Sequence, residues 1–501
     1  MNRRSFLLAG TACISFLRSA AAAVKMEDMP GMGAVHGKTP TAKTGILPAL
    51  PEGAPLRELP RLANRATQPG VFEAVLTAAP AKTRFVTGVE TGILAYNGQS
   101  PGPLIEAVEG ERVAITFVNR IPGEESTIHW HGMPTPADQD GGPMDAVAAG
   151  ADRTYAFDLP ERSAGSYWYH PHPHGKTAAQ VYRGLAGAFI VRPKSDPIPA
   201  EYGDTSLFFT DLRLTGDGAI APNAMVDLMN GRVGDHVLVN GQKNPLLTVA
   251  AGARRRFRLF NATNARYLRL SFGDAPMTLI GSDGGLLEAP VRDVSDILLA
   301  PGERAEVVTA FDKPGVSTLR TLSYDRGWMG AGRPRDAGLA LLTIRTLATP
   351  APAAPPLPQT LRVIADPGAP VVRRRLLFGE TMTTVAGGME MGFLINGAAF
   401  DMNRIDFVSK VGEVELWEIV NPTDMDHPFH VHGVQFQLVE TERHGAIVKP
   451  AYRALKDTVN VARSETLRIL LRQDRAGRRM YHCHILEHED LGMMGIVDVQ
   501  A

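Results

Sequence analysis

Three Asn-Gly pairs constrain the fold of this 501-residue chain more than any other feature of its sequence. Each pair follows an apolar stretch and precedes an alternating segment that is rich in β-forming residues and ends in asparagine. The pairs are Asn97-Gly98, Asn240-Gly241 and Asn396-Gly397, and the segments end at Asn119, Asn261 and Asn421. Asn-Gly is a strong signal for a tight turn between strands. The repetition therefore predicts an all-β protein built from three related units.

The three predicted units divide the chain into domains of ordinary size. We expect them to cover residues 70–195, 196–348 and 359–501. Residues 349–358 are rich in Pro and Ala and lack apolar periodicity, so we interpret them as a linker into the third unit. Residues 24–69, which contain several Met and Pro residues, are expected to form a flexible leader.

The N-terminal residues 1–23 have the pattern of an export signal. Arg3 and Arg4 form a twin-arginine pair, a short apolar run follows, and small residues end the segment. The apolar run is too short to span a bilayer as a retained helix. We therefore expect twin-arginine export and a mature protein that works in the periplasm.

Net charge and cysteine content exclude some partners and some chemistry. The formal net charge of −1 gives no reason to expect a nucleic acid or a membrane surface as a partner. Cys13 lies inside the expected signal, so removal of the signal leaves Cys483 as the single cysteine. No disulfide can then form within one chain.

The segment around Cys483 gathers the donor groups that copper prefers. His482-Cys483-His484 is followed by His488 and Met493, which places a thiolate, three imidazoles and a thioether within twelve residues. On a strand, Cys483 points to one face while its two neighbours point to the other, so one strand can serve two metal sites. A thiolate with two imidazoles and a distant thioether is the ligand set of a blue copper electron-transfer centre.

Pairs of alternating histidines occur far more often than chance allows. The chain has 14 histidines, and random placement predicts roughly 0.4 His-x-His pairs. Five are present, at 129/131, 170/172, 172/174, 430/432 and 482/484, and they form four spaced groups. One such pair on a strand is more often a surface or satisfied core feature, but four spaced groups together with a lone cysteine favour metal binding.

These motifs resemble those of the multicopper oxidases, the family of laccases and bacterial cuprous oxidases. The matching segments are, in order, His-Trp-His-Gly at 129–132, Trp-Tyr-His-Pro-His at 168–172, His-Pro-Phe-His-Val-His-Gly at 427–433 and His-Cys-His-x3-His-x4-Met at 482–493. The resemblance implies three consecutive cupredoxin-like Greek-key β-sandwich domains. It also implies a copper-dependent oxidoreductase with dioxygen as electron acceptor.

Carried over residue by residue, the resemblance implies four copper ions. The implied ligands are His427, Cys483, His488 and Met493 for type 1 copper; His129 and His430 for type 2 copper; and, for the two type 3 ions, His131, His170 and His484 on one and His172, His432 and His482 on the other. The first and third units hold all of these ligands and the second holds none. The three-copper cluster is therefore expected at the interface of the first and third units, with the second unit as a spacer.

The implied reaction needs routes for electrons and for protons. The covalent run from Cys483 to His482 and His484 would carry electrons from the blue copper to the cluster. Reduction of dioxygen to two waters also consumes four protons, and Asp140 and Glu489 match the acids that relay protons in related enzymes. An ordinary turn residue is the alternative for Asp140, and orientation of histidines or water is a third role open to both.

The reducing substrate is less clearly indicated. Relatives with these motifs oxidise Cu(I), phenols or aromatic amines, and thioethers favour Cu(I). Candidate Cu(I)-binding thioethers occur at Met26, Met29 and Met32 beside His36, and at Met382, Met389 and Met391. The leader methionines have an equally good interpretation as part of a plain flexible segment. Asp424 and Met425, just before His427, form a hypothetical Cu(I) docking site.

Two other classes of protein stay open at this level. Some exported three-domain proteins of this fold have lost their copper ligands and serve structural or cell-division roles, and a copper-binding carrier needs no complete three-copper cluster. Here every ligand position is filled, which favours the oxidase. We expect a monomer whose partners are dioxygen and small reducing substrates.

Overall fold

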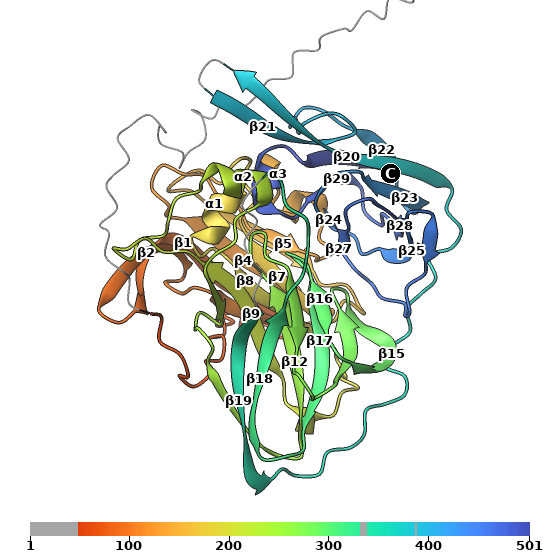
Figure 1. The fold of residues 1–501 in the computed structure, drawn as a ribbon. Coiled ribbons are helices and arrows are strands. Elements are labelled where there is room, and N and C mark those ends of the chain that lie inside the picture. Colours follow the sequence, from red (N-terminus) through yellow and green to blue (C-terminus); the bar gives the residue numbers. More distant parts are fainter. Residues whose placement is uncertain (1–48, 331–337, 386–387) are drawn as a thin grey trace, which may run out of the picture.

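Six β-sheets, paired into three sandwiches, account for most of the described structure. The computed structural model describes residues 49–330, 338–385 and 388–501, and Figure 1 shows the first sandwich in orange and yellow, the middle one in green and the third in cyan and blue. The prediction of an all-β protein with three related units is confirmed. The expected export signal and the methionines of the leader lie outside the described residues.

The first domain consists of two four-stranded sheets. One sheet contains, in spatial order, β2 (Val89–Tyr96), β1 (Val71–Val86), β4 (Arg112–Asn119) and β6 (Asp152–Asp158). The other contains β3 (Gly102–Val108), β8 (Gly187–Arg192), β7 (Gly165–His170) and β5 (His129–His131). The second sheet thus carries both histidine pairs of this domain on or directly after its strands β5 and β7.

The second domain has a six-stranded and a five-stranded sheet. The larger contains β10 (His236–Val239), β9 (Thr205–Leu212), β12 (Ala253–Asn261), β17 (Arg304–Phe311), β14 (Met277–Ser282) and β15 (Gly285–Val294). The smaller contains β11 (Leu246–Ala251), β19 (Leu339–Pro350), β18 (Gly315–Leu322), β13 (Leu268–Ser271) and β16 (Ile297–Leu299).

The third domain repeats this division. Its larger sheet contains β21 (Gly388–Ile395), β20 (Val372–Val385), β23 (Val414–Asn421), β28 (Glu465–Arg472), β25 (Gln437–Arg443) and β26 (Ala446–Val448). Its smaller sheet contains β22 (Phe407–Lys410), β30 (Met494–Gln500), β29 (Gly477–Cys483), β24 (His427–Val431) and β27 (Thr458–Val461). Strands β24 and β29 of this smaller sheet bear the histidine and cysteine motifs.

The three domains share one strand topology. The first strand of each domain pairs in parallel with the fourth, as β1 with β4, β9 with β12 and β20 with β23. The third strand pairs in parallel with the last, as β3 with β8, β11 with β19 and β22 with β30. These repeated non-local pairings make the units Greek-key sandwiches of the cupredoxin type.

The three Asn-Gly pairs form tight turns, as the sequence predicts. All six residues have positive φ values, between 50° and 78°. Each turn leads from the second strand of a domain, which lies in one sheet, to the third strand, which lies in the other. The turns therefore carry the chain across the sandwich from one sheet to the other.

The asparagine at the end of each fourth strand also has one repeated role. Its Nδ2 donates to two backbone carbonyls, one in the following loop and one on a facing segment, at 2.8 to 2.9 Å. The accepting residues are Glu124 and Val147 for Asn119, Arg266 and Leu299 for Asn261, and Met425 and Val461 for Asn421. These bonds set the start of the next strand and give a common register for comparing the domains.

Helices are few and short in the described residues. The α-helices are α1 (Thr177–Tyr182), α2 (Met225–Asn230) and α3 (Leu486–Asp490), and the 3₁₀ turns are η2 (Ala137–Gln139), η3 (Pro143–Asp145) and η4 (Ala200–Tyr202). The three α-helices lie together near the junction of the domains (Figure 1). Within the described ranges, no helix has the length and apolar character that crossing a bilayer requires.

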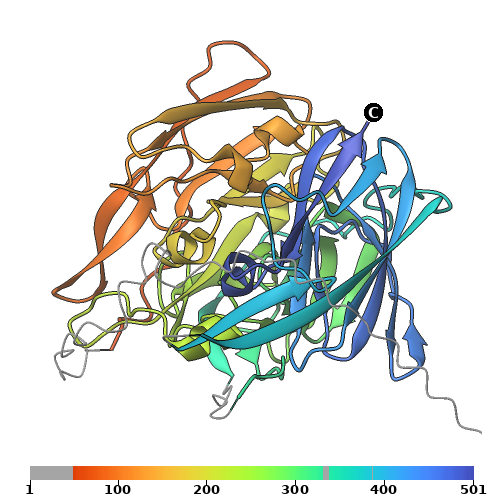
Figure 2. The same ribbon diagram turned by 90° about the horizontal axis from the view of Figure 1, so that it is seen from above.

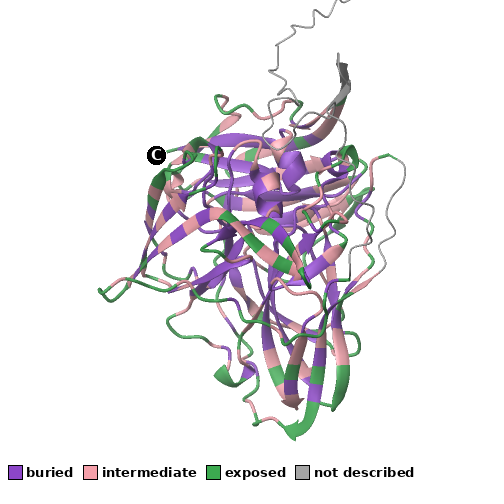
Figure 3. Ribbon diagram, turned by 90° about the vertical axis from the view of Figure 1, so that its left-hand side faces the viewer, coloured by how far each residue is buried: buried purple, intermediate pink, exposed green. Residues whose placement is uncertain are grey.

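Each domain has its own apolar core, and the buried residues concentrate in the sheets (Figure 3). The described end of the expected leader, residues 49–69, is tied to this frame by backbone hydrogen bonds. The N–H of Leu56 donates to the carbonyl of Leu246 at 2.9 Å, and the N–H of Leu62 donates to Leu104 at 2.8 Å. This part of the chain is therefore an extended segment held against the first two domains.

Candidate metal centres

The end of strand β29 supplies donors to two separate groups of buried side chains. The Sγ of Cys483 lies beside His427 and His488, whereas the Nε2 of His482 lies beside His172 and His432. Neighbouring side chains on a strand point to opposite faces, which accounts for this separation. Two peptide-linked residues thus belong to two different candidate metal sites.

The first group is the set predicted for type 1 copper. The Cys483 Sγ lies 3.4 Å from His427 Nδ1 and 3.9 Å from His488 Nδ1, and the two nitrogens are 3.3 Å apart. Met493 is fully buried in the same apolar core, and its carbonyl accepts the N–H of Cys483 at 3.0 Å. A cysteine, two histidines and a buried methionine are thereby gathered at one point.

Hydrogen bonds on the outer side orient both imidazoles of this group. His488 Nε2 donates to the carbonyl of Met229 at 3.1 Å, and His427 Nε2 donates to the hydroxyl of Thr423 at 2.9 Å. Each Nδ1 atom then carries a lone pair, and these lone pairs face each other and the sulfur. Burial raises the pKa of the Cys483 thiol, so a thiolate here needs a cation beside it. The arrangement fits a copper ion bound by two histidines and a cysteine.

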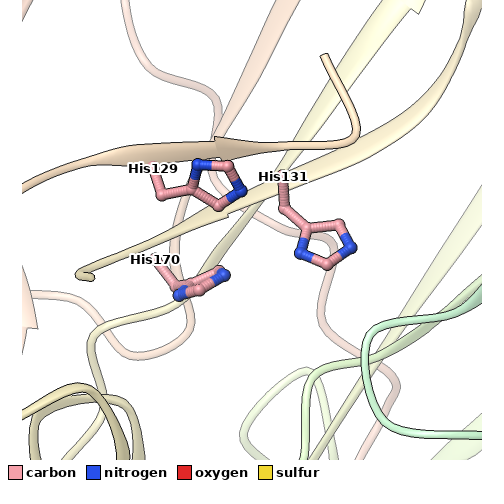
Figure 4. Close-up of side chains that lie close together, drawn as sticks. All are labelled: His129, His131 and His170. Atoms are coloured by element: carbon pink, nitrogen blue, oxygen red, sulfur yellow. The ribbon is translucent and has the colours of Figure 1, made fainter. Parts of the chain in front are cut away.

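The second group contains the other eight histidines of the four motifs, all fully buried. His482 Nε2 lies 3.0 Å from His432 Nε2 and 3.3 Å from His172 Nε2. Figure 4 shows three further members, His129 and His131 from β5 and His170 from the end of β7. The ring centroids of neighbouring pairs in the set predicted for the other type 3 ion, His131, His170 and His484, are 4.8 to 5.7 Å apart.

Backbone carbonyls determine which nitrogen of several rings carries the proton. Four Nδ1 atoms donate to carbonyls at 2.8 to 3.0 Å: His129 to Asp140, His170 to Pro171, His430 to Asp457 and His482 to Cys483. A carbonyl can only accept, so in each neutral ring Nε2 is left as a lone pair. The Nε2 atoms of three of these rings, and both ring nitrogens of His484, are buried without a hydrogen-bond partner among the described residues.

Converging lone pairs require a cation between them. Burial lowers the pKa of all eight rings, and that of His482 falls to about 3, so protonation of the rings does not relieve the repulsion. Buried neutral imidazoles with their other nitrogen held by an oxygen are the usual ligands of copper in proteins. The second group therefore fits copper, with its donors already aimed inward.

The second group has an approximate two-fold symmetry that relates the first and third domains. His129 pairs with His170 across β5 and β7, as His430 pairs with His482 across β24 and β29. The imidazole of His129 stacks on His432 and that of His131 on His430, with both centroid distances 3.8 Å. Figures 1 and 2 show the two domains side by side at this junction. The expectation that the histidines meet at the interface of these domains agrees with this geometry.

Two aspartates occupy equivalent positions around the histidines. Asp140 accepts from His129 through its carbonyl and from His432 through Oδ2 at 2.6 Å. Asp457 accepts from His430 through its carbonyl and from His131 Nε2 through Oδ1 at 3.1 Å. Each aspartate therefore orients one ring from each of the two domains.

The two aspartates differ in their counter-charges. The middle domain supplies Arg304, whose Nη1 and Nη2 donate to both carboxylate oxygens of Asp457 at 2.6 and 2.7 Å. The Nε of Arg304 also donates to the carbonyl of Ser166 in the first domain. Near Asp140 the guanidinium of Arg479 is 3.9 Å away and makes no hydrogen bond to it. Arg304 thus joins all three domains, while Asp140 has no such partner among the described residues.

Glu489, predicted to relay protons, lies against the second group from the side of α3. Its Oε2 is 3.1 Å from His482 Nδ1 and its Oε1 is 3.5 Å from His172 Nε2. Neither oxygen has a hydrogen-bond partner in the described part of the chain. Burial, together with the charge of Asp490, raises the pKa of Glu489 well above its ordinary value. The carboxyl can therefore hold a proton next to the histidines.

Asp424 and Met425, the hypothetical Cu(I) docking pair, differ in their exposure to solvent. Met425 is fully buried in the core of the third domain, and its carbonyl accepts from Asn421. Asp424 is exposed on the adjoining loop. The carboxylate is thus within reach of solvent and the thioether is not, and docking of Cu(I) at this pair stays a prediction.

Several residues of the site gave no signal in the sequence. Asp457 and Thr458 belong to no histidine motif, and Arg304 lies in a domain without ligands, more than 150 residues from its partner. The Met229 carbonyl acts through the backbone, which no side-chain pattern reports. Only the structure brings these groups to the histidines.

The fold and its donor sets define a copper-binding protein of the cupredoxin class. Sequence models described as multicopper oxidase match residues 77–196, 215–325 and 376–501. The chain is 33% identical over 436 residues to "Multicopper oxidase mco" of Staphylococcus aureus, covering 86% of this chain and 89% of that protein. A solved structure, "Multicopper oxidase from Campylobacter jejuni: a metallo-oxidase", has 39% identity and a TM-score of 0.85, with 92% of this chain and 98% of that chain covered.

A relative with a different name also matches over most of its length. "Cell division protein FtsP" of Photorhabdus laumondii is 32% identical over 450 residues, covering 87% of this chain and 90% of that protein. The chain belongs to the multicopper oxidase family. It is accordingly a copper-dependent oxidoreductase.

Proposed function

We propose that this chain couples the one-electron oxidation of a small reducing substrate to the four-electron reduction of dioxygen to water. One observation carries the proposal: Cys483 belongs to the first group of donors while its neighbour His482 belongs to the second. A centre that only stored or carried copper would not need a covalent connection between a cysteine site and an eight-histidine site. A centre that moves electrons from one to the other does.

The proposed loading is four copper ions, one in the first group and three in the second, with the type 1, type 2 and type 3 ligands given above. Copper would supply one-electron redox chemistry in the first group and the place where dioxygen is reduced in the second. The protein holds the imidazoles in fixed tautomers and excludes water from both groups, because every ligand side chain is buried. Rigid, preformed donors keep reorganisation small when electrons arrive.

Proton delivery is proposed for Asp140 and Glu489, which lie on different sides of the second group. Asp140 contacts His432 and His129, and within the described ranges no cation forms a hydrogen bond to its carboxylate. Glu489 contacts His482 and His172 and carries an elevated pKa caused by burial. Both carboxyls can exchange a proton with a molecule bound among the histidines.

Cu(I) is the substrate that the surroundings of the first group support best. The helix α2 covers His488 and bonds to it through the Met229 carbonyl. Met229 is half-buried and Met225 is exposed on α2, and the N–H of the half-buried Met329 donates to Asn230 of α2. Met391 packs against the core of the third domain. Thioethers favour Cu(I) over harder ions. Asp424 and Met425 are proposed as an additional docking point for Cu(I). Phenols and aromatic amines are proposed as alternative reductants that donate electrons at helix α2.

The absorption spectrum and oxygen uptake of the copper-loaded protein test the proposed function. The wild type should be blue and should consume oxygen with Cu(I) and, more slowly, with a phenol. Cys483→Ser should be colourless and inactive while the eight-histidine group still binds copper. Oxygen uptake that survives in Cys483→Ser would contradict the proposed electron route.

The docking point has its own test. Replacing Asp424 and Met425 together should raise the KM for Cu(I) and leave the phenol rate unchanged. Equal Cu(I) kinetics in the wild type and the double variant would remove this pair from the proposal.

Export through the twin-arginine pathway to the periplasm and action as a monomer complete the proposal. Arg3→Lys with Arg4→Lys should retain the protein in the cytoplasm, and light scattering should give the mass of one chain. A second function without oxidase activity is suggested by the relative named as a cell division protein. A colourless, inactive wild type after copper loading would favour that function.

A further inference from the structure

A cleft away from both metal groups has a distinctive lining. It has a volume of about 490 Å³ and lies where the first domain, the second domain and the segment before β20 meet. Four arginines line it, Arg162, Arg256, Arg258 and Arg362. Its apolar wall includes Leu286, Leu361 and Val363. A volume of this size accommodates a small organic molecule.

Two of the four arginines are largely neutralised by acidic neighbours. Arg256 donates to Asp196 at 2.6 Å and to Glu306 at 2.6 and 3.0 Å. Arg258 donates to Asp204 at 2.9 Å and to Glu306 at 2.6 Å, and also to Ser166. Arg256 and Arg258 therefore contribute little uncompensated charge to the cleft. The Nη2 of Arg258 is nevertheless buried without a hydrogen-bond partner among the described residues.

The other two arginines lack carboxylate partners in the described structure. Arg362 donates only to backbone carbonyls, to Gly284 at 2.6 Å and to Arg162 at 3.2 Å. Burial lowers the pKa of Arg362, and the nearby Tyr167 and Glu109 offset this effect only in part. Arg162 is exposed at the rim and forms no ion pair in the described ranges. Both oxygens of Glu306, one of the two acidic residues in the lining, are already occupied by arginines.

We propose that this cleft binds a small organic carboxylate, with its anionic head between Arg362 and Arg162 and its apolar body against Leu286, Leu361 and Val363. Guanidinium groups bind carboxylates through paired, charge-assisted hydrogen bonds. The bound anion joins the first domain, the second domain and the segment that leads into the third. The site is independent of copper and of the proposed oxidase reaction.

Isothermal titration of the copper-loaded protein with benzoate tests the site. We expect saturable binding to the wild type and at least tenfold weaker binding to Arg362→Gln and to Arg162→Gln. Arg162 is exposed, so that variant should fold even if removal of Arg362 disturbs the domain junction. Arg472→Gln is the matched control: Arg472 lines a neighbouring cleft and pairs with Asp474, and its loss should not change binding.

The same titration with inorganic phosphate separates an organic ligand from a plain oxyanion. Phosphate should bind at least tenfold more weakly than benzoate, because it lacks an apolar body. Benzoate should also raise the melting temperature of the wild type and not that of Arg162→Gln. Absence of saturable benzoate binding, equal binding by Arg162→Gln and the wild type, or phosphate binding as tight as benzoate would each overturn the proposal.

Discussion

The two sides of the eight-histidine group have the same geometry but different electrostatics. On one side Asp140 orients His129 and His432, and on the other Asp457 orients His430 and His131. Arg304 neutralises Asp457 with two hydrogen bonds, while no cation in the described part of the chain forms a hydrogen bond to Asp140. The middle domain therefore breaks a symmetry that the outer domains share. It fixes one carboxylate with a cation, and the other is the carboxylate that we propose as a proton relay.

Replacing Asp140 should have the largest effect on turnover. Asp140→Asn keeps an oxygen that can accept from His432 but cannot carry a proton, so oxygen uptake should fall by roughly 10²- to 10⁴-fold. Copper content and blue colour should stay at the wild-type level. Asp138→Asn, at an exposed neighbour, is the control. A fall of less than threefold in Asp140→Asn would remove the functional difference between the two aspartates.

Replacing Arg304 should lower the stability of the protein rather than its turnover. Arg304→Met leaves the buried Asp457 without its cation, which should lower the free energy of unfolding by about 3–5 kcal/mol in the copper-free protein. Urea denaturation measures this loss, and Arg254→Met on the exposed face of β12 is the control. A loss below about 1 kcal/mol would show that the ion pair does not hold the domains together.

Asp457→Asn should weaken copper binding by the eight-histidine group without stopping the proposed proton relay through Asp140. Loss of the charged acceptor of His131 should reduce copper affinity in the second group by about 10- to 100-fold, with the blue colour unchanged. At saturating copper, turnover should stay within a few-fold of wild type. In the double variant with Arg304→Met, stability should exceed that of Arg304→Met alone, because no unpaired charge is left. A turnover loss as large as that of Asp140→Asn would mean that both aspartates relay protons.

Replacing the hydroxyls next to the two aspartates should give the smallest difference between the two sides, measured as lost stability. Thr458 Oγ1 lies 3.0 Å from His131 Nε2 and donates to Asp457, whereas Thr135 Oγ1 donates to Asp140 over a longer 3.4 Å. Thr458→Val should cost about 1 kcal/mol of stability and Thr135→Val clearly less. Thermal unfolding of both variants measures the difference. Equal losses would indicate that the two sides are held equally firmly.

Much of the fold was predictable because it depends on short contiguous signals. The Asn-Gly pairs adopt the positive φ values that a tight turn requires, so three related β-units followed from the sequence. Their crossing from one sheet to the other did not follow, since a local turn signal carries no information on which sheet the next strand joins. The register of β5 with β7 depends equally on non-local pairing.

The histidine and cysteine positions were predictable for the same reason, whereas their supports were not. The four motif segments converge on two groups, although assignment of each side chain to an individual copper ion stays a prediction. Asp457 and Arg304 meet across 153 positions of sequence, and neither stands in a motif. A contact of that kind is fixed by domain packing, which single-sequence patterns do not encode.

The middle domain shows what the same strand pattern does without ligands. The shared asparagine bonds align β13 of the middle domain with β24 of the third, so that Leu268 takes the place of His427. Leu268 pairs with Leu299 and His427 pairs with Val461. The carbonyls of Leu299 and Val461 accept from the asparagine of their own domain. Two positions further along each strand, Leu270 pairs with Thr321 where Phe429 pairs with Cys483. The fold is thus independent of copper donors, and leucine side chains fill the corresponding positions in the interior of this domain.

The sharing of one histidine group between the first and the last domain has a consequence for biosynthesis. His129 is translated long before His484, so the complete set of donors exists only once the ribosome has finished the third domain and it has docked on the first. A prematurely terminated chain would lack the third domain's donors and could not retain copper there. Metal retention at the shared group is therefore a check that the whole polypeptide has been made and assembled.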